Sequence, residues 1–313
     1  MRVARSLHEA AEFGPTAVAI GNFDGVHIAH RELLSTVLRA SREHALAPSV
    51  MTFDPHPATI VAPHRTPRLL STPRERCNLL AREGIENVLI LPFTAVVSRW
   101  TPADFVERVL AKAFHAKAVI VGDNFRFGHR QAGDTRILAE LGRHFGFETH
   151  VVNSVSLRGR VVSSSEIRRA IEAGHASLAG RMLGRPYSVS GEVVSGQGIG
   201  SKQTVPTLNL RTPAQVIPKV GVYVTRTSDA TNESLRWDSI TNVGFRPTFS
   251  AAHELTIETF LLSPFTPPAP ERIRVEFLLR LRDERKFETA DALKTQILRD
   301  VRRAHNYFRR VQK

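Results

Sequence analysis

Two histidines, His27 and His30, stand three residues apart in the stretch GNFDGVHIAH, residues 21–30. An apolar run precedes them and a helical pattern follows, so they lie where a strand turns into a helix. In an open parallel sheet, ligands bind beyond the carboxyl ends of the strands. A helix N-terminus at that edge offers backbone N–H groups and a positive dipole end, and both favour phosphate. We therefore predict that the two imidazoles donate hydrogen bonds to the phosphates of a nucleoside triphosphate, with Gly21 and Gly25 allowing a tight backbone path.

The spacing of the two histidines also fits two different interpretations. They could belong to the exposed surface of a helix, or they could form half of a metal site. No cysteine or acidic cluster in the neighbouring sequence completes a zinc site. From spacing alone, phosphate binding and helix surface both stay open.

Three further groups of residues could act on phosphates or hydroxyls. The string SSSEIR places Ser164 and Ser165 before Arg168, where serines can cap a helix and an arginine can neutralise phosphate charge, although a plain N-cap has the same pattern. The string GQGIGS, residues 196–201, could cradle phosphates with its amides or simply form a hairpin. Glu258 could act as a base, although a lone glutamate in an alternating strand usually faces solvent.

The first part of the chain alternates strand and helix patterns. Strands are predicted at residues 16–23, 47–54, 86–93, 117–122 and 147–155, and helices at residues 31–46, 73–84, 101–116, 134–146 and 163–174. Thr101 and Pro102 are a typical start for the third helix. This α/β alternation predicts a parallel sheet with helices on both faces.

The second part of the chain has short, partly alternating runs separated by glycine, proline and asparagine. They lie at residues 187–196, 205–211, 221–227, 238–244, 255–262 and 273–282, and they predict an antiparallel barrel or sandwich. A terminal helix is predicted over residues 290–308, with apolar residues recurring at Leu293, Ile297, Val301 and Ala304. We expect two domains, residues 1–184 and 185–313.

The bulk composition limits the class of protein. The chain has 313 residues, 42% of them hydrophobic, which is enough for two cores. It has one cysteine, Cys77, so no intrachain disulfide can form. No apolar run approaches the ~20 residues of a membrane span, and residues 1–14 lack a signal-peptide core. We therefore expect a soluble cytoplasmic protein that is not bound to a membrane.

The net charge of +13 would attract polyanions, either nucleic acid or the phosphates of small metabolites. Most of the excess is scattered arginine, and the one cluster is the terminal RDVRRAHNYFRRVQK. We do not expect nucleic acid to be the main partner. The sequence leaves the oligomeric state open.

Several motifs in order carry a resemblance to a known family. GNFDGVHIAH resembles the HxGH-type loop of nucleotidylyltransferases, and TFDPHP (52–57), VGDNFRFGHRQAGD (121–134), SSSEIR (163–168) and LGRPYSVSGEVVSG (183–196) follow it. In this order and spacing they are similar to prokaryotic bifunctional riboflavin kinase/FMN adenylyltransferases, also called FAD synthetases. The family usually has glycine between the two histidines, where this chain has Ala29. Because both histidines are present, we expect this change to be tolerated.

For the first half, the resemblance implies a Rossmann-like nucleotidylyltransferase domain that transfers AMP from ATP to the phosphate of FMN, with Mg²⁺ accompanying the ATP. The implied catalytic residues are His27, His30 and Arg168. Phe125 and Phe127 are both implied to bind flavin, but from the residues alone we expect at least one of them to belong to the core. The implied ATP-binding residues are Gly21, Phe23, Asp24, Gly25, His27, His30, Ser164, Ser165 and Arg168, and the implied flavin-binding residues are Asn124, Phe125 and Phe127.

For the second half, the resemblance implies a β-barrel riboflavin kinase that transfers the γ-phosphoryl group of ATP to riboflavin. Glu258 matches the family's catalytic glutamate, and Thr207 and Asn209 in VPTLNL match its Mg²⁺ and ATP segment, with Leu208 in place of alanine. Gly196 and Gly200 match the phosphate loop. The chain departs from the family at Ser201, at Thr204 and in the stretch SPFTPPAPER, residues 263–272. Because Glu258, Thr207 and Asn209 are retained, we expect a working kinase.

The leading hypothesis is thus a bifunctional enzyme with riboflavin, FMN and ATP as substrates. A second hypothesis is that only the FMN adenylyltransferase is active, and that the barrel is a degraded flavin-binding module. A third is a basic nucleic-acid-binding protein. A fourth is a nucleotidylyltransferase with a different substrate, which would have no need of the β half.

Overall fold

The computed structural model describes residues 1–313 except 195–206, 213–214, 233, 247–253, 264–268 and 312–313. The chain divides into two compact units, Met1–Ser164 and Ser165–Lys313, and each is described by itself below. The predicted domain boundary at residue 184 stays a prediction.

The first unit is built on a six-stranded sheet in the order β1-β4-β3-β2-β5-β6, in which every neighbouring pair is parallel. The predicted parallel sheet is therefore confirmed. The first strand was not predicted, because only its last residue is buried and it has no apolar run. The strands are β1 (Arg2–Ala4), β2 (Thr16–Ile20), β3 (Ala47–Phe53), β4 (Asn87–Leu91), β5 (Ala116–Gly122) and β6 (Glu148–Val152).

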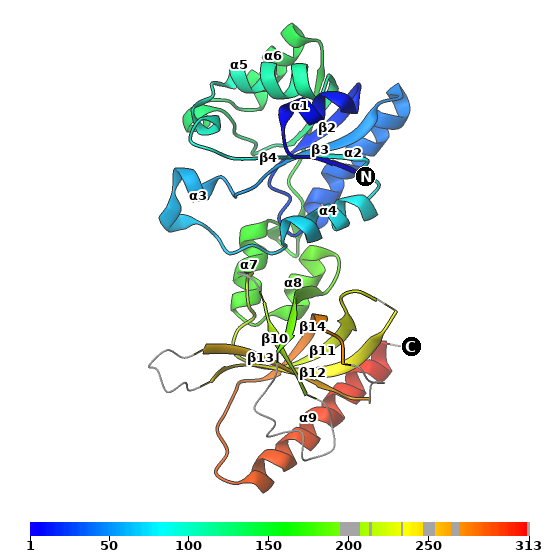
Figure 1. The fold of residues 1–313 in the computed structure, drawn as a ribbon, viewed down its shortest axis with the longest axis vertical. Coiled ribbons are helices and arrows are strands. Elements are labelled where there is room, and N and C mark those ends of the chain that lie inside the picture. Colours follow the sequence, from blue (N-terminus) through cyan, green and yellow to red (C-terminus); the bar gives the residue numbers. More distant parts are fainter. Residues whose placement is uncertain (195–206, 213–214, 233, 247–253, 264–268, 312–313) are drawn as a thin grey trace. The chain divides into compact units, whose positions relative to one another are not determined.

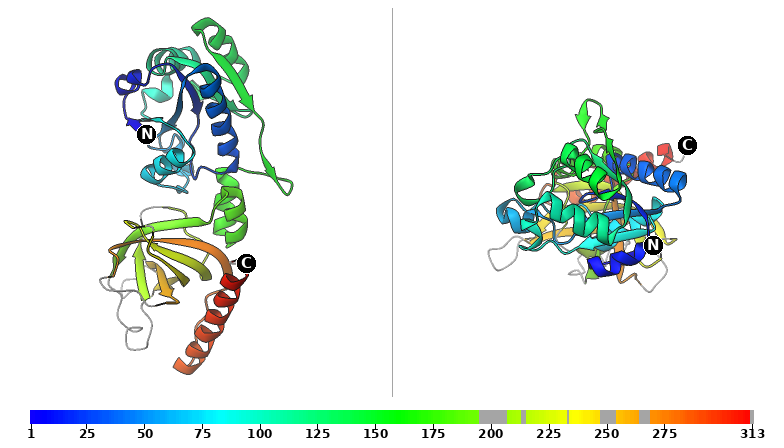
Figure 2. Two further views of the ribbon diagram at one scale, coloured as in Figure 1. Left: turned by 90° about the vertical axis from the view of Figure 1, so that its right-hand side faces the viewer. Right: turned by 90° about the horizontal axis from the view of Figure 1, so that it is seen from above.

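Helices cover both faces of this sheet, as predicted (Figures 1 and 2). Each face of the sheet carries its own hydrophobic core. Side chains alternate along β2, so that Val18 packs into the core on one face and Ala19 into the core on the other. The first face carries α1 (Leu7–Ala10), α5 (Pro102–Phe105), the π-helix η4 (Val106–Ala113) and α6 (Thr135–Phe145), and the second carries α2 (Ile28–His44) and α4 (Pro73–Arg82). Shorter elements are η1 (Ala11–Phe13), α3 (Ala58–Val61), η2 (Pro63–Arg65), η3 (Val97–Arg99), η5 (His129–Gln131), β7 (Ser156–Leu157) and β8 (Arg160–Val161).

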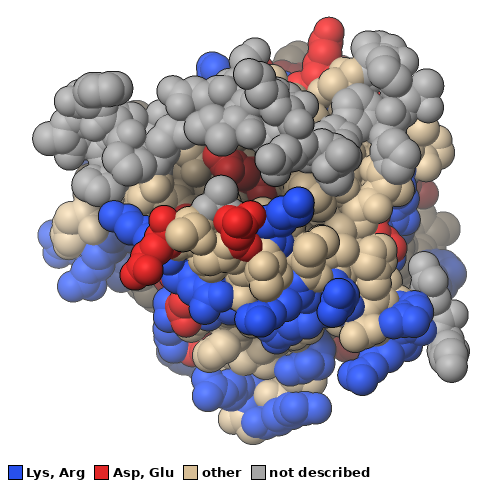
Figure 3. Space-filling model, turned by 90° about the horizontal axis from the view of Figure 1, so that it is seen from below, with Lys and Arg blue, Asp and Glu red and all other residues tan. Residues whose placement is uncertain are grey.

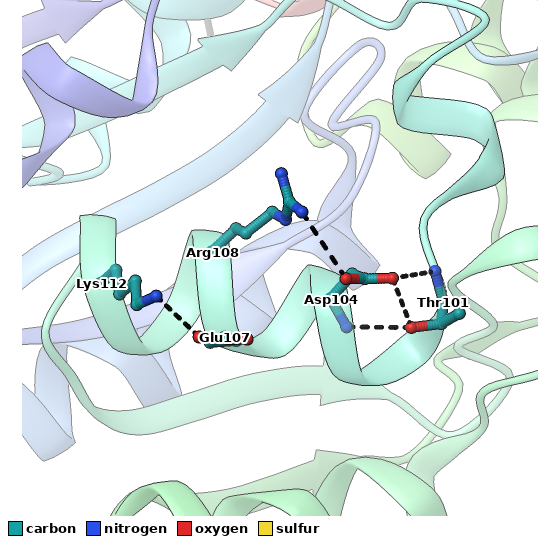
Figure 4. Close-up of polar contacts among 5 residues, drawn as sticks. All are labelled: Thr101, Asp104, Glu107, Arg108 and Lys112. Atoms are coloured by element: carbon teal, nitrogen blue, oxygen red, sulfur yellow. Dashed lines mark hydrogen bonds and ion pairs between the residues drawn. The ribbon is translucent and has the colours of Figure 1, made fainter.

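The predicted helix start at Thr101 is confirmed, with a reciprocal capping box (Figure 4). The Asp104 backbone N–H donates to Thr101 Oγ1 over 3.1 Å, and the Asp104 carboxylate accepts from the Thr101 backbone N–H over 3.1 Å. The continuation differs from the prediction, because Val106–Ala113 is a π-helix. Its wider turn brings side chains five residues apart together, as in the 2.6 Å ion pair of Lys112 with Glu107.

The second unit contains a closed antiparallel barrel in the order β10-β13-β12-β11-β14-β9, which decides between the predicted barrel and sandwich. Its interior holds a row of hydrogen-bonded hydroxyls: Thr225 contacts Ser239 and Thr241 over 2.8 Å each, and Thr241 contacts Thr259 over 2.9 Å. All six predicted strands are present. They are β9 (Tyr187–Val194), β10 (Thr207–Arg211), β11 (Gly221–Asp229), β12 (Arg236–Arg246), β13 (Glu254–Leu261) and β14 (Arg272–Arg282).

Two helices precede the barrel, α7 (Ser164–Glu172) and α8 (Ala176–Leu183), and α9 (Ala290–Val311) follows it. Helix α8 was not predicted; it packs beside β14, where Ser177 Oγ donates to the Leu278 carbonyl over 2.9 Å. The predicted terminal helix is confirmed, and it packs Ala304 and Phe308 against an outer apolar surface of the barrel. The periodicity placed Leu293 and Ile297 on the same face of the helix as Ala304, but their side chains are 42% and 37% exposed.

The exposed side of α9 is basic, with Arg299, Arg302, Arg303, Arg309 and Arg310 in solvent. Lys and Arg side chains are spread widely over the face of the molecule seen from below (Figure 3). In the described part of the chain, no helix is both long enough and apolar enough to cross a bilayer.

Candidate functional site

The loop between β2 and α2 ends in a capping box made entirely of histidine. His27 is the N-cap of α2: its Nδ1 accepts the His30 backbone N–H over 3.3 Å, and His30 Nδ1 accepts the His27 backbone N–H over 3.4 Å. The two rings stack with their centroids 3.6 Å apart and their planes inclined by 12°. The helix N-terminus that the sequence predicted is therefore present, and the rings themselves form its cap.

These hydrogen bonds fix the tautomer of both rings. A ring nitrogen that accepts a hydrogen bond carries no proton, so each neutral imidazole holds its proton on Nε2. Both side chains are therefore donors through Nε2, next to the positive end of the α2 dipole. Two N–H donors at a helix N-terminus can bind phosphate oxygens.

The backbone of this loop follows a tight path. Phe23, Gly25 and Val26 have positive φ angles of 47°, 80° and 38°, a region that only glycine adopts readily. Burial holds the two bulky residues there, because Phe23 and Val26 are almost completely excluded from solvent. The Phe23 ring also contacts the His30 ring, with centroids 4.9 Å apart. Strain of this kind, imposed by packing, is typical of functional sites.

Asp24 ties the loop to the rest of the first unit. Its buried carboxylate accepts hydrogen bonds from the backbone N–H groups of Leu70 and Ser71, each over 3.0 Å. Ser164 Oγ donates to the Asp24 carbonyl over 3.0 Å, which brings the first helical serine of the SSSEIR motif to the GNFDG loop. Ser165 and Arg168 follow on α7 and belong to the second unit.

The carboxyl end of β3 meets the same loop through Thr52, and Arg76, a residue that was not predicted from the sequence, holds that end of the strand. Arg76 Nη1 donates to Thr52 Oγ1 over 2.9 Å and to the Phe53 carbonyl over 3.2 Å, and Thr52 Oγ1 donates to the Asn22 carbonyl over 2.9 Å. Burial lowers the pKa of Arg76, and the nearby charge of Asp24 opposes that shift. The sequence did contain a signal that Arg76 is buried, because Arg76 lies on the apolar face of its helix, four residues before the buried Leu80.

The TFDPHP motif also reaches this loop. His56 Nδ1 accepts the Ala58 backbone N–H over 3.1 Å, and His56 Nε2 lies 3.2 Å from the side-chain amide of Asn22. The motifs of residues 21–30 and 52–57 therefore meet at one edge of the sheet, as their positions after β2 and β3 predict.

The predicted flavin residues lie on the loop after β5. Asn124 is exposed, Phe125 is half-buried and Phe127 is buried in the core, which confirms that at least one of the two rings belongs there. The two rings stack with centroids 5.4 Å apart and planes inclined by 15°. Gly133 makes this possible, because a Cβ at that position would lie 2.6 Å from the Phe127 ring.

In the second unit, β-sheet register brings the predicted kinase residues together. Asn209 on β10 is directly opposite Glu258 on β13, and Thr207 lies two residues before Asn209 on the same face of its strand. Glu258 and Asn209 are half-buried, and Thr207 is exposed. Gly196 and Gly200 lie outside the described residues, as do Ser201 and Thr204.

Comparisons with known proteins agree with both halves of this geometry. The family model for FAD synthetase matches residues 9–166, and the model for riboflavin kinase matches residues 183–308. The chain is similar to the bifunctional riboflavin kinase/FMN adenylyltransferase of Pseudomonas fluorescens, with 33% identity over 96% of each chain. It is also similar to that of Escherichia coli strain K12, with 32% identity over 98% of each chain. Among solved structures, the macrolide-efflux protein from Streptococcus pneumoniae matches with a TM-score of 0.85 and 29% identity, over 94% of this chain and 95% of that one.

Proposed function

This chain belongs to the bifunctional riboflavin kinase/FMN adenylyltransferase family, and we propose that its two units carry the two activities on the residues described above. The second unit phosphorylates riboflavin to FMN with ATP. The first unit joins FMN to the AMP part of a second ATP, giving FAD and pyrophosphate.

In the adenylyl transfer, a phosphate oxygen of FMN attacks the α-phosphorus of ATP, and the bond from that phosphorus to the bridging oxygen of pyrophosphate breaks. The FMN phosphate is already a nucleophile, so the protein must align the groups and stabilise charge rather than supply a strong base. We assign this to the Nε2–H groups of His27 and His30, supported by the α2 dipole. The histidine capping box is the observation that carries this assignment.

The remaining predicted residues of the first activity keep their proposed roles. We place the flavin by Asn124 and Phe125, and Phe127 supports Phe125 from the core. Gly21, Phe23, Asp24 and Gly25 shape the nucleotide loop, with the buried carboxylate of Asp24 acting through Leu70 and Ser71. Ser164, Ser165 and Arg168 bind phosphate oxygens in this proposal.

In the kinase reaction, Glu258 accepts the proton of the riboflavin 5′-hydroxyl as that oxygen attacks the γ-phosphorus of ATP, and the bond from that phosphorus to the bridging oxygen breaks to release ADP. Thr207 and Asn209 would hold Mg²⁺ through side-chain oxygens, which are the hard donors that suit this ion. The ion would neutralise phosphate charge when it is bound. Gly196 and Gly200 keep their predicted role at the phosphates.

The pairing of Asn209 with Glu258 favours an active kinase over a degraded flavin-binding module. The family's substrates also favour a cytoplasmic location, where ATP is abundant, and small molecules rather than nucleic acid as partners.

The deciding experiment is a product assay on the purified full chain. Riboflavin with ATP and Mg²⁺ should give FMN and then FAD, and FMN with ATP and Mg²⁺ should give FAD and pyrophosphate. If riboflavin is not phosphorylated while FAD still forms from FMN, the barrel is a degraded module instead.

A further inference from the structure

Three polar side chains form one row across neighbouring strands of the barrel. Asn209 on β10 pairs with Glu258 on β13, and Glu258 in turn pairs with Asn242 on β12. Directly paired residues project from the same face of a sheet, and neighbouring strands are about 4.8 Å apart. Glu258 therefore has a polar neighbour on each side, and only the one on β10 was predicted from the sequence.

The side chain of Asn242 is held by a second carboxylate. Asn242 Nδ2 donates to Glu284 Oε1 over 3.2 Å. An ionised carboxylate can only accept hydrogen bonds, so the amide must turn its nitrogen toward Glu284. Among the residues that the structure describes, the carbonyl oxygen and the second N–H of Asn242 have no other partner. Asn242 thus presents one acceptor and one donor, which is the pair of functions that an alcohol hydroxyl satisfies.

Glycine makes room for this carboxylate. A Cβ at Gly244 would lie 2.2 Å from Glu284 Oε1 and 2.8 Å from Glu284 Cδ. A larger residue at this position would require the end of the Glu284 side chain to shift.

The segment that carries Glu284 is fastened to α9 on both sides. Arg282 Nε donates to Asp300 over 2.8 Å, Gln296 Nε2 donates to the same carboxylate over 2.8 Å, and Arg285 donates to Gln296 Oε1. Asp300 and Gln296 are 2% and 8% exposed, so this network is shielded from water and holds its geometry. Glu284 lies between the two anchored arginines, so its backbone is held near Asn242, while its side chain is exposed and contacts Asn242 at 3.2 Å.

We propose that Asn242, oriented by Glu284, binds an inner hydroxyl of the polyol chain of the kinase's alcohol substrate. The inference rests on the proposed roles of Asn209 and Glu258. If Asn209 is at the phosphate end and Glu258 takes the proton of the reacting hydroxyl, then Asn242 lies on the side of Glu258 away from Asn209. There the rest of the alcohol must continue, and the next hydroxyls of a ribityl chain reach across one strand spacing. Asn242 is a substrate-positioning residue in this proposal, and Glu284 acts through it.

The test combines Asn242→Ala with a change in the substrate. The analogue is a flavin with a 5-hydroxypentyl chain, which keeps the terminal hydroxyl of riboflavin and lacks the inner ones. For riboflavin, Asn242→Ala should raise KM about tenfold, the effect of one lost hydrogen bond, with KM for ATP unchanged. Wild-type enzyme should bind the analogue about tenfold less well than riboflavin, and Asn242→Ala should no longer distinguish the two. An equal loss for both substrates would overturn the proposal, because it would mean that Asn242 acts on structure alone.

A second pair of variants separates positioning from folding. Glu284→Gln should raise KM for riboflavin about threefold, because a glutamine no longer dictates which way the Asn242 amide faces. Glu288→Gln, which alters an exposed glutamate of the same segment, is the matched control and should leave KM unchanged. Equal effects of these two variants would also overturn the proposal. FMN adenylylation by each variant reports on the other unit, and thermal unfolding shows whether the barrel is intact.

The failure of this inference can be distinguished from the failure of the proposed function. If Glu258→Gln abolishes riboflavin phosphorylation and Asn242→Ala leaves both KM values at wild type, only the role of Asn242 is wrong. If Glu258→Gln keeps full kinase activity, the assignment of the base is wrong, and the inference falls with it.

Discussion

His27 and His30 fix each other twice, through reciprocal hydrogen bonds to backbone N–H groups and through stacked rings whose centroids are 3.6 Å apart. Each ring is therefore an important part of the other's surroundings. This relationship links local structure to chemistry, since the same contacts that cap α2 leave the ring protons on Nε2.

The first prediction concerns that coupling. His30→Ala should reduce FAD formation from FMN about 10²-fold or more, because one donor is lost and the other is released from its cap. His27→Ala should act similarly, and the double variant should be little worse than either single one, since coupled residues are not additive. Initial rates of pyrophosphate release measure this. Phosphorylation of riboflavin serves as the control and should stay unchanged; a loss of both reactions in a folded variant would refute the assignment.

The second prediction reverses the pattern for the barrel. Glu258→Ala should slow riboflavin phosphorylation by about 10²–10⁴-fold, the usual worth of a positioned base, while FAD formation from FMN continues. Separation of FMN and FAD by chromatography checks both rates in one sample. Thr259 is the next residue on the strand but points into the barrel, so Thr259→Ser, which retains the hydroxyl of the buried row, is a suitable control.

The third prediction concerns Arg76. Arg76→Met should destabilise the first unit by about 3 kcal/mol, because Thr52 and the Phe53 carbonyl lose a buried donor and Asp24 loses a nearby positive charge. FAD formation should fall while riboflavin phosphorylation is retained. Urea unfolding measures the stability. Arg74→Met, at an exposed position on the same helix, should change neither stability nor activity.

A fourth prediction tests close packing in the barrel. A Cβ at Gly191 would lie 2.0 Å from the Arg211 carbonyl oxygen, so Gly191→Ala must push β9 away from β10. We expect a loss of about 2–3 kcal/mol in the stability of the second unit and reduced kinase activity. Gly180→Ala is the matched control, because its Cβ would meet nothing closer than 3.5 Å and it lies in helix α8. That control should be neutral or stabilising by up to about 1 kcal/mol.

The fifth prediction is a pH effect at the loop that carries the proposed flavin residues. Hydrogen bonds from the Ser154 hydroxyl and backbone N–H lower the pKa of Asp123. A carboxylate with a lowered pKa stabilises the fold above its unfolded pKa of about 4, and the contribution disappears as pH falls through the folded value. Ser154→Ala should therefore raise the pKa of Asp123. NMR titration measures it, and the stability difference between wild type and variant should shrink on acidification below about pH 4.

The sequence by itself determined the order and type of most elements and the identity of the motifs. Apolar periodicity identified five of the six parallel strands and all six barrel strands, because an element with a buried face has apolar residues at regular intervals in its sequence. The helix start at Thr101 followed from capping chemistry, which is local in sequence. The short β1 and helix α8 were missed because so few residues carry little periodic signal.

Only the tertiary structure decided which distant residues meet. The hydrogen bond of Arg76 with Thr52 depends on how helix α4 packs against the sheet, and the position of Asn242 beside Glu258 depends on how strands pair. No local pattern encodes either contact. The choice of a closed barrel over a sandwich has the same origin, because closure joins β9 to both β10 and β14. Register and closure are set by the packing of the whole core, and a shift of one residue would turn Glu258 from the outer face into the interior.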